Sequence, residues 1–336
     1  MKKTLFTAYL ALLICLVPAF SMAWSSPPGA VSPAPSPSAA RAEPSPSPAA
    51  KPVPSAPPRQ DIELIYGEDI LSLPMEEYLI GVVAAEMPAS FQPEALKAQA
   101  VAARSYALYC IASGKHDSGR ICADFRCCQA WSEDESLRSR WGADYDKYRQ
   151  AVSQAVQATA GQYLSYEGQA IFAAFHSSSA GATEDCGAIW SPLPYLVSVS
   201  SPETAQTVPG FVSQVELSPL DFRDTILSAC PEADMSGDAS AWLGAIEPEA
   251  SGRVASVEIG GSSISGEKLR SLFSLRSTAF SLEYTGSAFL FTVKGHGHGV
   301  GMSQYGAEHM AAEGQSYAQI LAHYYPGTQL TDAGAV

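Results

Sequence analysis

The 336-residue chain is 46% hydrophobic and 16% charged, which permits a substantial core and excludes wholesale disorder. From Asp61 onward, 15 basic residues face 33 acidic ones, a net charge of −18. Such a body lacks the clustered cations that bind nucleic acid or an anionic membrane surface. Asparagine is absent from the sequence, which excludes Cys-His-Asn catalysis and N-glycosylation.

The N-terminal segments predict export. Residues 1–24 combine Lys2 and Lys3 with an apolar run and a small-residue cleavage site, as in a signal peptide, and an uncleaved membrane anchor is the alternative. Residues 25–60 are dominated by Pro, Ser and Ala, with 12 of the 24 prolines, and predict a disordered, extended linker. We therefore expect a folded body over 61–330 outside the cytoplasm, either membrane-anchored or secreted into the cell wall.

The first predicted helix carries a candidate acid at its end. Ser72, Pro74 and the acidic pair that follows are typical of a helix start, and Pro88 predicts a stop near Met87. Glu86 then lies at the helix C-terminus and on its apolar face. Burial and the helix dipole both disfavour a carboxylate there, and a carboxyl that stays neutral near pH 7 suits a general acid. An ordinary solvent-seeking acid is the alternative interpretation.

An alanine-rich stretch starting at Pro93 and ending before Gly114 predicts a second helix, packed closely against the first. Arg104 is a polar residue in this apolar context. We interpret it as a residue facing a substrate cleft, with a salt-bridge partner as the alternative.

A cysteine cluster follows the second helix. Besides Cys15 the chain has six cysteines, and an even count in an exported protein first suggests disulfides. However, one histidine and three cysteines lie within 13 residues, the ligand set of a closed, structural zinc site. We predict that this site binds zinc, with disulfides as the alternative, and its ligands are His116, Cys122, Cys127 and Cys128.

The rest of the chain predicts an α+β body. A hairpin is expected over Tyr163–Tyr166 and Ala170–Phe175. Ser200–Ser287 reads as an inserted, smaller subdomain, with helices at Pro219–Ser228 and Gly266–Phe273. The glycine-rich segment around His296 and His298 lacks the Lys-Ser/Thr of a nucleotide-binding loop. We interpret it as loop architecture lining a cleft, with a metal-binding His pair as the alternative.

Several motifs together resemble the stage II sporulation protein D family, which includes the LytB-type amidase enhancers. They are Glu86-Met87-Pro88 with EALKAQAVAAR at 94–104, FHSSSAGAT at 175–183, Pro194-Tyr195-Leu196, GHGVGMSQYGA at 297–307 and His323-Tyr324-Tyr325-Pro326-Gly327. The resemblance spans nearly all of 61–330. Some family members carry a structural zinc on two His and two Cys at the spacing of the cysteine cluster, with Cys127 here replacing the second His.

The resemblance implies a lytic transglycosylase that cleaves peptidoglycan glycan strands, preferentially strands without stem peptides, in cell-wall remodelling linked to sporulation. Its catalytic acid is Glu86, and catalysis needs no cofactor. The motifs imply these substrate-binding candidates: Arg104, His176, Ser177, Ser178, Thr183, Tyr195, His298, Ser303 and Gln304. A cell-wall amidase is the expected partner, and a non-catalytic, glycan-binding activator of such an amidase is the alternative function.

Overall fold

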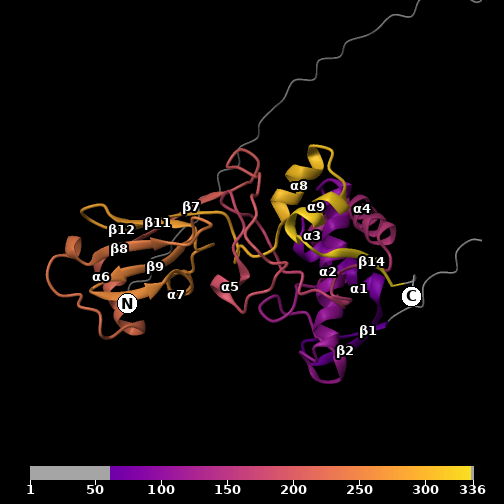
Figure 1. The fold of residues 1–336 in the computed structure, drawn as a ribbon, viewed down its shortest axis with the longest axis horizontal. Coiled ribbons are helices and arrows are strands. Elements are labelled where there is room, and N and C mark those ends of the chain that lie inside the picture. The colour runs from indigo at the N-terminus through magenta and orange to yellow at the C-terminus, as the bar shows by residue number, and fades with distance from the viewer. Residues whose placement is uncertain (1–60, 334–336) are drawn as a thin grey trace, which may run out of the picture. The chain divides into compact units, whose positions relative to one another are not determined.

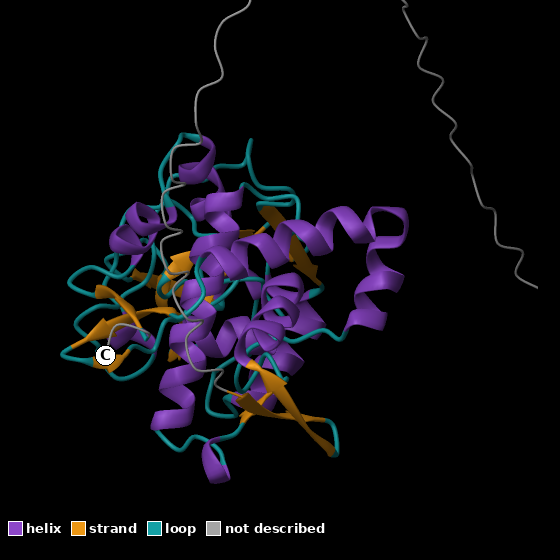
Figure 2. Ribbon diagram, turned by 90° about the vertical axis from the view of Figure 1, so that its right-hand side faces the viewer, coloured by secondary structure: helices purple, strands orange, loops and turns teal. Residues whose placement is uncertain are grey.

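The computed structural model describes residues 61–333, so the predicted signal segment and linker lie outside the described residues. Helices and strands occur together in this body, which confirms the α+β prediction (Figure 2). Two hydrophobic cores organise it. Within the described range, no helix has the combined length and apolar character required to cross a lipid bilayer.

The first core is built around α2 (Pro93–Ala112), which contacts four other α-helices and three short strands (Figure 1). Its alanines are buried on most sides, and small side chains let neighbouring backbones approach closely. The helices around it are α1 (Met75–Glu86), α4 (Tyr145–Ala158), α8 (Gln304–Ala312) and α9 (Tyr317–Tyr324). The predicted second helix and its packing against the first are thus confirmed.

Short strands flank the first core. A hairpin of β1 (Asp61–Tyr66) and β2 (Asp69–Pro74) takes β3 (Ile121–Cys122) as a parallel partner. The other strands are β4 (Gln162–Tyr166), β5 (Gln169–Ala170) and β14 (Gln329–Asp332) in one sheet, and the parallel pair β6 (Phe175–His176) and β13 (Met302–Ser303) in another. Shorter helices are α3 (Asp134–Trp141) and α5 (Cys186–Ile189).

Two local predictions were wrong in detail. Ser72 does not cap α1, because it lies in β2 opposite Glu63, and the helix instead begins after Pro74 without a side-chain cap. The second strand of the predicted 163–175 hairpin ends at Ala170. Beyond that residue the chain leaves the ladder and forms β6 with a different partner.

The second core lies in the stretch for which a subdomain is predicted, and its elements are here called the subdomain. Its strands are β7 (Val212–Leu217), β8 (Leu243–Pro248), β9 (Val254–Ile259), β10 (Ser262–Ser265), β11 (Phe280–Tyr284) and β12 (Phe289–Lys294), and its helices are α6 (Pro219–Ala229) and α7 (Gly266–Leu272). Two three-stranded antiparallel sheets enclose stacked aromatic rings, with Phe222 and Phe289 only 3.9 Å apart between centroids. Because β12 belongs to this core, the subdomain extends past the predicted boundary at Ser287.

Candidate active site

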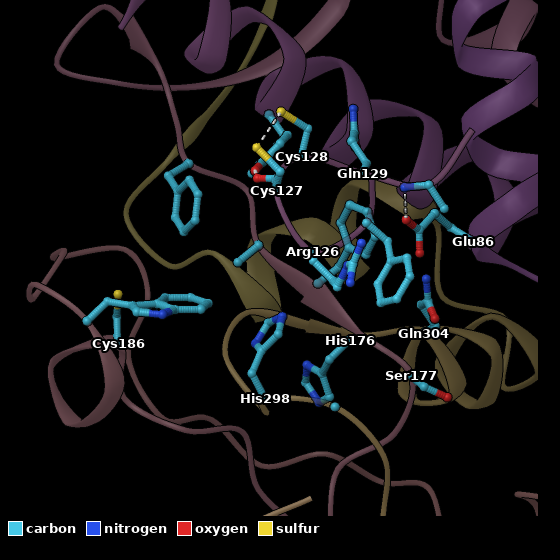
Figure 3. A pocket seen from close by; sticks show the side chains of 18 of the residues that line it. Glu86, Arg126, Cys127, Cys128, Gln129, His176, Ser177, Cys186, His298 and Gln304 are labelled. Atoms are coloured by element: carbon cyan, nitrogen blue, oxygen red, sulfur yellow. Dashed lines mark hydrogen bonds between the residues drawn. The ribbon is translucent and has the colours of Figure 1, made fainter. Parts of the chain in front are cut away.

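A cavity of about 930 Å³ brings together segments that are distant in the sequence (Figure 3). The end of α1, the cysteine-bearing segment after α2, the 172–177 stretch, the segment around α5, the glycine-rich loop and the start of α8 all line it. Residues from both cores take part, since Arg270 of α7 also lines the cavity. Its volume lies in the range of small-molecule sites.

Glu86 lies in this cavity as predicted, at the last position of α1. Its Oε1 accepts a hydrogen bond of 2.7 Å from the backbone N–H of Ala130 (Figure 3). The Gln304 amide is the second group that lowers the pKa of the carboxyl. Desolvation by burial outweighs these two donors and raises the pKa of Glu86. Among the described residues that line the cavity, Glu86 is the only carboxylate.

Gln304 is held by its own neighbours. It is the first residue of α8, and Ser303 caps that helix by accepting the N–H of Gly306. The Gln304 side chain also reaches the buried Gln99, where Nε2 lies 3.5 Å from Oε1. Gln304, which is predicted to bind substrate, lines the cavity beside the Glu86 carboxyl group.

The two histidines predicted to bind substrate, His176 and His298, line the cavity together with His296, and the ring centroids of the predicted pair lie 5.7 Å apart (Figure 3). His176 Nδ1 donates to the Val300 carbonyl at 3.2 Å, and its Nε2 lies 2.6 Å from the Ser179 hydroxyl. His298 Nδ1 accepts the Val300 N–H at 3.1 Å. Burial lowers the pKa of His176 and lowers that of His298 to about 4, so both rings are neutral at pH 7.

The loop that carries His298 depends on glycines. Gly297 and Gly299 have φ values of 109° and 89°, which residues with a side chain rarely adopt. A Cβ at Gly297 would lie 2.8 Å from the Cβ of His176, and one at Gly299 would lie 2.5 Å from the Arg253 Nη2. This agrees with the interpretation of the segment as loop architecture, and in the described residues His296 and His298 join no metal-ligand cluster.

The predicted zinc ligands lie together on the segment that follows α2. The candidate ligand atoms of His116, Cys122, Cys127 and Cys128 all lie within 4.8 Å of one another. The His116 Nε2 is 3.5 Å and 3.4 Å from the two adjacent sulfurs, which are 4.0 Å from each other. Around a tetrahedral zinc ion, a ligand nitrogen and a ligand sulfur lie about 3.6 Å apart, and two ligand sulfurs lie about 3.8 Å apart. The residues therefore fit this metal.

The same segment also supports the acid. Cys127 and Cys128 line the cavity, and Ala130, two residues later, donates to Glu86. Gln129 anchors the segment through hydrogen bonds to the Tyr78 hydroxyl and to a backbone carbonyl of α2. All six described cysteines are unpaired in this structure.

Several predicted substrate-binding residues do not line the cavity. The Arg104 guanidinium is buried and bonded to Thr159 O and Gln162 O at 2.8 Å and to Glu76 at 2.5 Å, so the salt-bridge alternative is correct. Ser178 is buried, and its backbone pairs with that of His296. The hydroxyls of three others form hydrogen bonds inside the protein or at a helix end, and these residues are Thr183, Tyr195 and Ser303. Ser177 does line the cavity.

The aromatic and cationic side chains that line the cavity were not predicted from the sequence. Phe125 and Trp190 are 72% and 42% exposed, unusually high for such residues, and both line the cavity. The cations Lys115, Arg126 and Arg270 line it as well. A tryptophan in a Gly- and Pro-rich loop was the available signal for Trp190, while nothing local marks Arg270 as a cavity residue.

Comparisons with known proteins agree with the predicted resemblance. Residues 68–166 match the family described as SpoIID, Stage II sporulation protein. Stage II sporulation protein D of Bacillus subtilis is 37% identical over 273 residues, which cover 80% of this chain and 77% of its own. Its namesake in Bacillus amyloliquefaciens is 37% identical over 266 residues, covering 78% and 75%.

A further relative has a different name. The amidase enhancer of Bacillus subtilis is 31% identical over 301 residues, which cover 75% of this chain and 40% of the enhancer. The likeness to the sporulation proteins extends over most of both chains, well beyond the 68–166 match. The chain therefore belongs to the stage II sporulation protein D family.

Proposed function

We propose that the protein is a lytic transglycosylase that cleaves peptidoglycan glycan strands, with Glu86 as its general acid and base. The observation that carries the proposal is the lone carboxylate of the cavity: among the described residues that line it, Glu86 is the only acid, and its pKa is raised. Glycoside hydrolases need two carboxylates about 5–9.5 Å apart, one of them to activate water or form a covalent intermediate. A transglycosylase needs one.

A single acid is sufficient for this reaction because the sugar's own 6-hydroxyl is the nucleophile. Protonated Glu86 gives its proton to the glycosidic oxygen as the bond from the muramic acid C1 breaks. The resulting carboxylate then takes the proton of the same sugar's 6-hydroxyl, whose oxygen bonds to C1 and forms a 1,6-anhydro ring. No water is consumed, and Glu86 ends the cycle protonated, as it began.

The neighbours of Glu86 support both halves of this cycle. Burial raises the pKa of the Glu86 carboxyl and so favours the protonated form that the first proton transfer needs, and the Ala130 N–H and the Gln304 amide stabilise the carboxylate formed by that transfer. His176 and His298 are neutral and add no charge that would lower the pKa of the acid. The Ser177 hydroxyl, which lines the cavity, offers hydrogen bonds to sugar hydroxyls and amides.

We also propose that His116, Cys122, Cys127 and Cys128 bind a structural zinc ion, whose four protein ligands would leave no open position for chemistry. The spacing of the ligand atoms supports this. The ion would fix the segment that supplies Ala130 to the acid.

The substrate and setting complete the proposal. Strands stripped of stem peptides are the substrate we expect, in the cell wall outside the membrane, as the N-terminal sequence and the family suggest. A cell-wall amidase that removes those peptides is the proposed partner, and the enhancer relative supports this pairing. The same relative favours a second candidate function: a glycan-binding activator of an amidase.

Mass spectrometry of the products distinguishes these functions. Peptide-free glycan strands are incubated with wild type and with Glu86→Gln, which keeps the size and hydrogen-bonding capacity of the side chain. We expect 1,6-anhydromuramic ends with wild type and a loss of about 10²–10⁴-fold in the variant. Reducing ends would refute the transglycosylase. Intact strands with both proteins, together with acceleration of an added amidase, would establish the activator.

A further inference from the structure

A row of ring contacts runs along the cavity. Tyr109, Phe172, Trp190, His298 and His176 follow one another with centroid distances of 5.4, 5.6, 5.0 and 5.7 Å, and all of them line the cavity. Trp190 is the most exposed aromatic of the row and the only one whose exposure exceeds 40%. A solvent-exposed indole in such a cavity is a binding surface for the flat, CH-rich face of a ligand.

The position of Trp190 is fixed before any ligand arrives. It directly follows α5, and its backbone N–H donates to the Cys186 carbonyl at 2.7 Å. The rings of Phe172 and His298 both contact its ring. A ring held in this way loses little conformational entropy when a ligand stacks on it.

Arg270 brings a positive charge to the same corner of the cavity. After burial, the charge of Arg270 makes the largest contribution to lowering the pKa of His298, and the His298 ring contacts Trp190. Within the described residues, the Arg270 guanidinium makes a single hydrogen bond, to Glu267 at a long 3.4 Å. Most of its five donors are therefore available to a ligand.

The other two cations of the cavity are more fully engaged. Lys115 donates to the Tyr106 hydroxyl at 3.1 Å and to the Cys127 carbonyl. Arg126 is bonded through two nitrogens to both carboxylate oxygens of Asp124. Arg270 is thus the cation best able to bind an anionic group of a ligand.

We propose that Trp190, His298 and Arg270 form a subsite for a sugar ring that carries a free carboxylate. The pyranose stacks on the indole, and Arg270 binds the carboxylate. The identity of the sugar rests on the proposed function: in a glycan strand it is a muramic acid whose lactyl carboxylate is free because no peptide is attached to it. Arg270 is then a specificity-determining residue, since a peptide amide at that position has no charge to pair with it.

Binding is measured by titration calorimetry on the Glu86→Gln form of the full chain, so that no ligand is turned over. Three probes are compared: a peptide-free GlcNAc-MurNAc tetrasaccharide, the same tetrasaccharide with its lactyl carboxylates converted to methylamides, and tri-N-acetylchitotriose. Arg270→Gln removes the charge, and Arg223→Gln, outside the cavity and paired with Asp224, is the control for net charge. Trp190→Ala removes the platform, and Trp190→Phe keeps an aromatic face.

We expect Arg270→Gln to weaken binding of the free tetrasaccharide about tenfold or more and to leave the methylamide and chitotriose unchanged. Trp190→Ala should weaken the affinity for all three probes about tenfold or more, and Trp190→Phe should restore it. Arg223→Gln should leave the affinity for every probe unchanged. Equal effects of Arg270→Gln on the free acid and the methylamide, or undiminished binding by a folded Trp190→Ala, would overturn the proposal.

The two proposals fail separately. If wild type releases no anhydro sugars but the Arg270 and Trp190 variants bind the probes as expected, the subsite is supported and the transglycosylase proposal is refuted. If anhydro sugars form while Arg270 and Trp190 are without effect on binding, the subsite is wrong and the transglycosylase stands.

Discussion

Substituting alanine for Gly299 tests how firmly the glycine-rich loop is packed against the second core. Gly299 has φ 89°, and an added Cβ would lie 2.5 Å and 2.6 Å from two nitrogens of Arg253, which is only 1% exposed. The backbone conformation costs about 1–2 kcal/mol for a residue with a Cβ. Displacing a fully buried guanidinium adds about 1–3 kcal/mol of overpacking.

The matched control is Gly286→Ala. Gly286 has φ 93°, and its Cβ would meet nothing within 4 Å, so this variant carries the backbone cost alone. Urea unfolding of both variants beside wild type should therefore place Gly299→Ala about 1–3 kcal/mol below Gly286→Ala. Because the loop carries His298, Gly299→Ala should also lose activity that Gly286→Ala retains. Equal destabilisation by the two substitutions would refute the packing of Arg253 under the loop.

Three more substitutions test the acid, the metal site and the corrected role of Arg104. The folded-state pKa of Glu86 is raised by burial, so wild type loses stability as pH rises through that pKa. Glu86→Gln removes the cost of burying the carboxylate and should raise the Tm near pH 8 by about 2–4 °C for each kcal/mol of that cost. This gain in Tm should vanish by pH 4. A Tm difference between variant and wild type that stays constant across pH contradicts the reasoning. Cys122→Ser should abolish zinc binding in metal analysis and remove the stabilisation that zinc gives wild type, about 2.7 kcal/mol at 100 times Kd; a chelator that leaves the wild-type Tm unchanged would exclude the metal. Arg104→Met should cost about 3 kcal/mol in denaturant unfolding, since it breaks a buried network with Glu76, while KM stays constant; a raised KM at unchanged stability would restore a substrate role.

The features that the sequence predicted best depend on signals a few residues long. Pro88 ends α1, so the position of Glu86 at a helix terminus could be predicted without knowing the fold. The composition of α2 predicted both the helix and its close packing.

The wrong predictions concern residues whose partners are distant in the sequence. Ser72 has the chemistry of a helix cap, but pairing with Glu63 draws it into a strand. Arg104 could not be assigned until folding brought Thr159 and Gln162 to it. The contribution of Arg270 to the cavity likewise depends on how the two cores meet, which no local pattern encodes.

The uneven distribution of charge predicts an unusual response to ionic strength. Acidic residues outnumber basic ones in the body as a whole, yet the cavity is lined by three cations, Lys115, Arg126 and Arg270, and by one carboxylate. A carboxylate-bearing strand is thus repelled at long range and attracted only at the cavity. Salt that shortens the screening length from about 30 Å at 0.01 M to about 10 Å at 0.1 M removes the long-range repulsion first. The rate constant for association should therefore rise with added salt and then fall, with its maximum at an intermediate salt concentration.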